Sequence, residues 1–106
     1  MDPPLEIDVT TAAQWWREGV LLVDVREDSE VATCRIEGSR HIPMRQIPEK
    51  LADLPRDRPV LVLCHHGGRS LRVTQFLRAN GFGLASNVAG GIDAWAQWIE
   101  PAMPRY

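Results

Sequence analysis

One stretch of this 106-residue sequence reads Val60-Leu-Val-Leu-Cys64-His-His-Gly-Gly-Arg69-Ser70. Its leading apolar residues are typical of a β-strand covered on both faces, and beyond Ser70 the apolar residues change to the three- and four-residue spacing of a helix. A strand, a tight glycine turn and a new helix N-terminus together form a nest for an anion. We therefore expect the cysteine in this nest to be a thiolate and to lie at the centre of the protein's function.

The length and composition indicate one globular domain of ordinary kind. With 44% hydrophobic and 25% charged residues, the chain fits neither the disordered nor the membrane classes. Its net charge of −2 argues against nucleic acid as the main partner. The first residues, Met-Asp-Pro-Pro, lack the basic region and apolar run of a secretory signal. We therefore expect a cytoplasmic protein that binds neither nucleic acid nor a membrane.

Strands that alternate with helices along the chain predict an α/β fold with a mostly parallel sheet and helices on both faces. The apolar runs at 20–25 and 60–64 predict buried strands, and shorter strands are expected at 6–9, 41–43 and 86–88. Helices are expected after an N-cap at Thr10 or Thr11, from Asp28 or Ser29 to about Cys34, from Met44 to Leu54, from Ser70 to Asn80, and after Gly90-Gly91. Parallel strands place their carboxyl ends at one edge of the sheet, where such sheets bind ligands.

Cys64 is the candidate nucleophile. A free thiol has a pKa of about 8.5, and helix N-termini or neighbouring cations lower it to roughly 3.5–7.5. The other interpretation is a buried cysteine that acts as a small apolar residue, which is common for a lone cysteine. The position at a strand end, the adjacent glycines and the nearby Arg69 favour the catalytic interpretation.

Four segments, in order along the chain, resemble the motifs of the rhodanese-like sulfurtransferases. They are Leu22-Val-Asp-Val-Arg-Glu27, similar to the family's DVRE strand end; Arg35-Ile-Glu-Gly-Ser39 with His41-Ile-Pro43, similar to its GHIPGA…NIP segment; Cys64-His-His-Gly-Gly-Arg-Ser70, similar to its Cys-x-x-Gly-x-Arg-Ser loop; and Gly90-Gly-Ile-Asp-Ala-Trp95, similar to its closing GG…W helix. The resemblance covers nearly the whole chain. It implies one rhodanese domain over residues 1–106 with that family's three-layer fold.

The resemblance also implies a function, in which Cys64 attacks the outer sulfur of a donor such as thiosulfate and becomes a persulfide. A thiol, cyanide or protein acceptor then removes that sulfur, so ping-pong kinetics are expected. The substrate-binding residues would be those of the loop, whose amides stabilise the anionic persulfide: His65, His66, Gly67, Gly68 and Arg69. Asp24, Arg26 and Ser70 would support the loop. No metal ion and no cofactor is expected.

Several individual roles stay open at this stage. Arg69 would either orient the donor's anionic group or brace the loop, and each loop histidine would either add positive charge or simply pack or be solvated. A metal ion is disfavoured because adjacent histidines in a tight loop cannot easily share one ion with Cys64. Cys34 is expected to pack as an apolar residue rather than to resolve the persulfide, and Arg35, where the family has Gly or His, is a possible donor contact.

The length of the loop separates two chemistries on this fold. Related phosphatases place five residues between the nucleophilic cysteine and the arginine, whereas four intervene here, and the smaller loop suits a sulfur atom. Sulfur transfer is therefore favoured over a cysteine phosphatase or arsenate reductase. The remaining alternative is a binding or sulfur-relay module that passes its persulfide sulfur to a partner protein.

Overall fold

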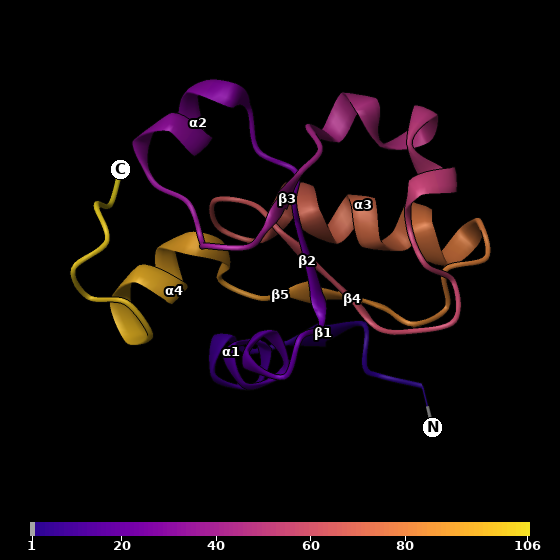
Figure 1. Ribbon diagram of the computed structural model, residues 1–106, viewed down its shortest axis with the longest axis horizontal. Helices are drawn as coiled ribbons and strands as arrows, with labels where there is room; N and C mark the ends of the chain where they lie inside the picture. Colours follow the sequence, from indigo (N-terminus) through magenta and orange to yellow (C-terminus); the bar gives the residue numbers. More distant parts are fainter. Residues whose placement is uncertain (1) are drawn as a thin grey trace.

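A five-stranded sheet forms the centre of the computed structural model, which describes residues 2–106 (Figure 1). Its strands are β1 (Glu6–Ile7), β2 (Leu21–Asp24), β3 (Arg40–His41), β4 (Val60–Leu63) and β5 (Ala85–Val88). They lie in the order β1-β5-β4-β2-β3, and each neighbouring pair is parallel. The predicted α/β fold with a parallel sheet is therefore confirmed. The central strands β4 and β2 are the two apolar runs of the sequence, as expected for strands covered on both faces.

Helices cover both faces of this sheet (Figure 1). One face packs against α1 (Val9–Arg17) and α4 (Gly91–Trp98), and the other against α3 (Gly68–Ala79) and two 3₁₀ segments, η1 (Met44–Glu49) and η2 (Leu51–Asp53). Successive side chains of a strand point to opposite faces of the sheet and enter different hydrophobic clusters. Leu61 therefore shares a cluster with Trp95, whereas Val62 shares the other with Leu77. The short helix α2 (Asp28–Thr33) follows β2 at the edge where the strands end.

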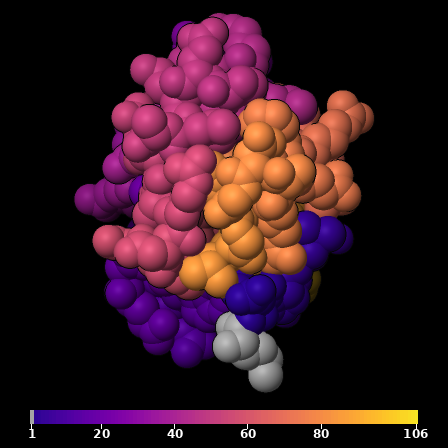
Figure 2. Space-filling model, turned by 90° about the vertical axis from the view of Figure 1, so that its right-hand side faces the viewer, coloured from indigo at the N-terminus to yellow at the C-terminus, as the bar shows by residue number. Residues whose placement is uncertain are grey.

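The opposite end of the sheet is closed by segments that are far apart in the sequence. Figure 2 shows residues near position 80 (orange) between those near position 55 (magenta) and the N-terminal residues (indigo). Arg56 lies over the ring of Phe82 at 4.2 Å, and Arg78 Nη2 donates to the carbonyl of Pro3 at 2.8 Å. These contacts join the segments that precede β1, β4 and β5.

Two local expectations were wrong in detail. Asp8, rather than Thr10 or Thr11, caps α1, because its Oδ1 accepts the Thr11 backbone N–H at 2.8 Å. The helix expected from Met44 to Leu54 is replaced by η1 and η2. Pro48 lies inside η1, and a proline lacks the N–H and has the ring that together prevent a regular α-helix. Across residues 2–106, the helices are all too short or too polar to cross a bilayer.

Candidate active site

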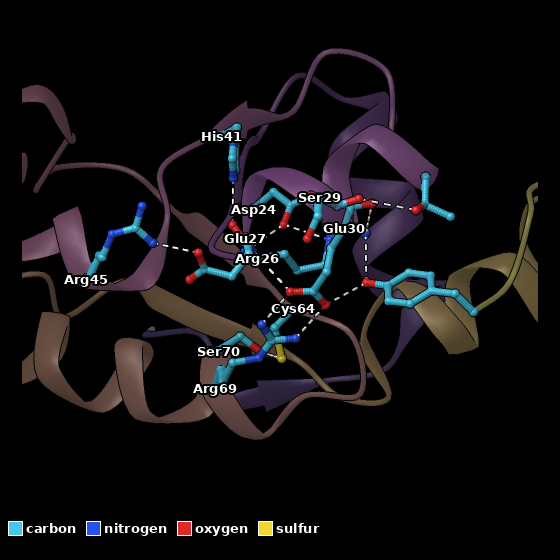
Figure 3. A network of polar contacts seen from close by, with 12 residues as sticks. Asp24, Arg26, Glu27, Ser29, Glu30, His41, Arg45, Cys64, Arg69 and Ser70 are labelled. Atoms are coloured by element: carbon cyan, nitrogen blue, oxygen red, sulfur yellow. Dashed lines mark hydrogen bonds and ion pairs between the residues drawn. The ribbon is translucent and has the colours of Figure 1, made fainter.

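Cys64 follows β4 directly and is 1% exposed. Its Sγ accepts the Gly67 backbone N–H at 3.1 Å and the Ser70 hydroxyl at 3.2 Å (Figure 3). Hydrogen bonds of this kind stabilise a negative charge on sulfur. We expected the amides of the whole loop to surround the sulfur, but within residues 2–106 only that of Gly67 donates to it.

The loop is held in place by the start of α4. The backbone N–H groups of Ile92 and Asp93 donate to the carbonyls of Cys64 and His65 at 2.9 and 3.1 Å. A Cβ atom at Gly91 would overlap both carbonyl oxygens, so this close approach requires glycine. Gly67 has φ +106°, a left-handed conformation that turns the chain from the loop into α3. The glycines of two distant motifs therefore meet at the same point.

Arg69 forms an ion pair with Glu30 of α2. Its Nη1 and Nη2 donate to Glu30 Oε1 and Oε2 at 2.6 and 2.8 Å (Figure 3). The hydrogen bonds from Arg69 lower the pKa of Glu30 to about 2. We expected Arg69 either to orient the donor or to brace the loop, and its pairing with Glu30 favours the bracing role. Glu30 was not among the predicted site residues, because nothing in the sequence distinguishes it from the neighbouring acids Glu27 and Asp28.

Asp24 and Arg26 form a second, fully buried ion pair beside the loop. Arg26 Nη2 lies 2.7 Å from Asp24 Oδ2, and both residues are 0% exposed. The same guanidinium donates to the carbonyls of Glu30 at 3.2 Å and Cys34 at 2.8 Å. The pair therefore ties the end of β2 to α2, whose Glu30 in turn holds Arg69 of the loop. A supporting role for Asp24 and Arg26 stays a prediction, with which these contacts are compatible.

The two loop histidines differ in their surroundings. The His65 ring lies between the rings of His66 and Tyr106, with centroids 3.8 Å away on each side. Burial, and then the neighbouring His66, lower the pKa of His65. The His66 side chain is 67% exposed, and its Nε2 lies 4.0 Å from Asp93 Oδ2. His65 is thus packed and His66 solvated.

One group of residues could in principle hold a metal ion near the loop. In the described part of the chain, His65, His66 and Asp93 offer potential ligand atoms within 4.8 Å of one another. Both carboxylate oxygens of Asp93 already accept hydrogen bonds from Arg105 at 3.1 Å. Cys64 is not part of this group.

Tyr106 lies against the loop, a contact that no pattern in the sequence predicts. The Tyr106 hydroxyl donates to Glu30 Oε2 at 2.8 Å and accepts from Arg26 Nη1 at 2.9 Å. Burial in particular raises the pKa of Tyr106 to about 12. A residue 42 positions after Cys64 in the sequence therefore joins the network that supports the loop.

The other candidate residues lie at the margin of the site. Gly68 is exposed at the first turn of α3, and Ser70 is buried. Cys34 is buried, with its Sγ 4.0 Å from Arg26 Nη1, and both cysteines are free thiols. Arg35 is exposed on the surface.

The parallel sheet and the cysteine loop at the start of α3 define a class of protein, which sequence comparison with known families identifies. The family model described as rhodanese-like domain matches residues 8–97, and the chain belongs to that family. It is 40% identical over 80 residues to a protein of Allochromatium vinosum named sulfurtransferase, covering 76% of this chain and 75% of that protein.

Two further relatives match this chain over most of the length of both proteins. A putative sulfurtransferase of Bacillus subtilis is 42% identical over 84 residues, covering 79% of this chain and 81% of that one. The crystal structure of a rhodanese-like domain protein from Staphylococcus aureus superposes with a TM-score of 0.79 at 35% identity, covering 90% and 91% of the two chains.

Proposed function

We propose that this protein is a sulfurtransferase that carries a sulfane sulfur on Cys64. The observation that carries the proposal is the position of the Cys64 Sγ, which accepts hydrogen bonds from Gly67 and Ser70 at the start of α3. These donors are already oriented toward the sulfur before any substrate binds. Preorganised donors of this kind stabilise a charge that develops during reaction. The names of the relatives from Allochromatium vinosum and Bacillus subtilis support the same activity.

With thiosulfate as donor, the reaction consists of two displacements. The Cys64 thiolate attacks the outer sulfur, the sulfur–sulfur bond of thiosulfate breaks, and sulfite leaves with the electron pair. Cyanide or a thiolate then attacks the terminal sulfur of the Cys64 persulfide, and the thiolate of Cys64 leaves. One sulfur atom moves from donor to acceptor and no external oxidant or reductant is consumed. Covalent catalysis of this kind gives ping-pong kinetics.

The geometry supports a distinct role for each of the surrounding residues. Gly67 and Ser70 donate hydrogen bonds to the reacting sulfur of Cys64, which is buried. Arg69 braces the loop against Glu30, while Asp24 and Arg26 hold the strand end beneath it. Exposed His66 is the loop residue placed to meet an anionic donor as it approaches. Four residues separate Cys64 from Arg69, which favours sulfur over phosphate as the group bound in the loop.

The test compares the protein with its Cys64→Ser variant. Each is incubated with thiosulfate, its intact mass is recorded, and thiocyanate is followed after cyanide is added. We expect one added sulfur atom and thiocyanate release with the wild type only. The Cys34→Ala variant serves as the matched thiol control and should behave as the wild type. A folded, reduced protein that gains no sulfur from thiosulfate but hydrolyses an aryl phosphate through Cys64 would overturn the proposal.

A further inference from the structure

Arg105 and Tyr106 hold segment 101–106 against α4 and the cysteine loop. Arg105 donates to both carboxylate oxygens of Asp93 on α4, each at 3.1 Å. The Tyr106 ring is stacked on His65 with an interplanar angle of 10°. Its hydroxyl bridges Arg26 and Glu30. Pro104, Arg105 and Tyr106 line a small cavity together with His65 of the loop and with residues of α4.

These contacts connect Tyr106 to both ends of the cysteine loop, to His65 through the stacked ring and to Arg69 through Glu30. Glu30 Oε2 accepts from Arg69 Nη2 and from the Tyr106 hydroxyl, both at 2.8 Å. The Arg69–Glu30 pair and the Tyr106–His65 stack thus form a continuous wall along the loop. Cys64 of the same loop is 1% exposed, whereas Tyr106 is 41% exposed. Tyr106 is therefore a surface cover and not part of the hydrophobic core.

We propose that Tyr106 is a specificity-determining residue of the Cys64 site, which restricts sulfur transfer to small donors and acceptors. The inference rests on the proposed function and narrows its substrate class. Thiosulfate and cyanide pass the wall while Tyr106 stays in place. A bulky thiol or a protein acceptor reaches Cys64 only after Tyr106 leaves His65 and its hydroxyl gives up both hydrogen bonds. These interactions exist only while Tyr106 stays on the loop. They therefore disfavour binding of the larger partners, which require Tyr106 to move away.

The decisive experiment measures access to Cys64 without requiring sulfur transfer. Iodoacetamide and iodoacetamidofluorescein have the same reactive group and differ in size. The rate at which each alkylates Cys64 is followed by mass spectrometry of the Cys64 peptide, which separates it from Cys34. The ratio of the two rates reports access, since a change in thiol reactivity affects both reagents alike. The variants are Tyr106→Ala, Tyr106→Phe and, as a control, exposed Arg17→Ala.

We expect Tyr106→Ala to raise the ratio of bulky to small reagent rates by about tenfold, equivalent to about 1.4 kcal/mol. Tyr106→Phe keeps the stacked ring and loses the hydroxyl bridge, so it should raise the ratio by a smaller factor. Arg17→Ala should leave the ratio unchanged. In parallel, Tyr106→Ala should raise kcat/KM for glutathione as acceptor more than kcat/KM for cyanide.

The proposal is overturned if the ratio of alkylation rates in Tyr106→Ala stays within twofold of the wild type. It is also overturned if Arg17→Ala changes the ratio as much as Tyr106→Ala does. Circular dichroism and melting temperature identify a variant that has unfolded, and Tyr106→Phe then carries the test. Failure of the wild type to form a persulfide counts against the proposed function alone, because the alkylation ratios are measured independently of it.

Discussion

Arg69 and Glu30 are joined by two hydrogen bonds, of 2.6 and 2.8 Å, that connect the cysteine loop to α2. Paired N–H donors on a planar guanidinium match the two oxygens of a carboxylate, which fixes both side chains in orientation as well as in position. The Glu30 side chain is 18% exposed and that of Arg69 34%. Because the pair is partly shielded from solvent, we expect it to contribute to the free energy of unfolding and to fix the position of the loop.

Removing the charge of Glu30 should change how the protein responds to acid. Its pKa falls from 4.5 in the unfolded chain to about 2 in the folded one, chiefly because of the hydrogen bonds from Arg69. The unfolded state therefore binds more protons between these values, and the free energy of unfolding decreases as the pH falls through this window. The shift corresponds to at most about 3 kcal/mol. Urea unfolding of Glu30→Gln at pH 7, 4.5 and 3 should show a flatter pH dependence than the wild type.

The control for that experiment is Glu27→Gln, which alters a more exposed ion pair with Arg45. It should follow the wild-type pH dependence, because exposed pairs contribute little to stability. Parallel curves for Glu30→Gln and the wild type would show that the Arg69 pair does not produce the acid sensitivity.

Replacing Arg69 by lysine should impair sulfur transfer although the positive charge is kept. A lysine cannot donate to both oxygens of Glu30 from a planar fork, so one charge-assisted hydrogen bond, worth about 1.5 kcal/mol, is lost and the loop is held less firmly. We expect kcat/KM for thiosulfate to fall by about tenfold. The matched variant Arg45→Lys, at an exposed pair, should retain wild-type activity. An unimpaired Arg69→Lys enzyme would refute a bracing role for the guanidinium fork.

The glycine that joins the loop to α4 should tolerate no side chain. A Cβ atom at Gly91 would overlap the carbonyl oxygens of Cys64 and His65, and both are backbone atoms that cannot turn aside. Gly91→Ala should therefore lower the free energy of unfolding by more than about 2 kcal/mol and abolish persulfide formation. Gly68→Ala is the matched control, because nothing lies within 4 Å of its Cβ position. Equal melting temperatures for the two variants would contradict this account of the loop.

Deleting one partner of the buried Asp24–Arg26 pair should destabilise the fold. Asp24→Ala leaves the guanidinium buried without its carboxylate, which costs about 3–5 kcal/mol in comparable buried pairs. Urea unfolding at pH 7 measures the change directly. Asp57→Ala removes a carboxylate from an exposed pair with Arg58 and should change stability by less than about 0.5 kcal/mol. Similar losses in both variants would mean that burial is not the cause.

The parts of this structure that the sequence predicts are those with a strong local pattern. The apolar runs identified β2 and β4, and the chain reverses at Gly67 because only a glycine readily adopts its φ of +106°. Apolar spacing predicted a helix after Met44, but spacing cannot outweigh Pro48, which the structure accommodates in 3₁₀ turns.

The contacts between elements were beyond the reach of the sequence. Glu30 is one acid among several after β2, and only the folded chain brings it opposite Arg69. Tyr106 reaches His65 because α4 positions segment 101–106 next to the loop, and no periodicity in the sequence encodes that contact. The cysteine loop could be located from its local motif, whereas the Arg69–Glu30 ion pair and the Tyr106–His65 stack depend on tertiary structure.

The sheet order has a consequence for synthesis of the protein. β1, near the start of the chain, pairs with β5, and the carbonyls of Cys64 and His65 are held by residues 92 and 93. A nascent chain that has left the ribosome only as far as α3 therefore lacks both the partner of its first strand and the helix that fixes its cysteine. Because domains generally fold as units during translation, Cys64 gains its contacts with α4 only when the last quarter of the described chain has emerged.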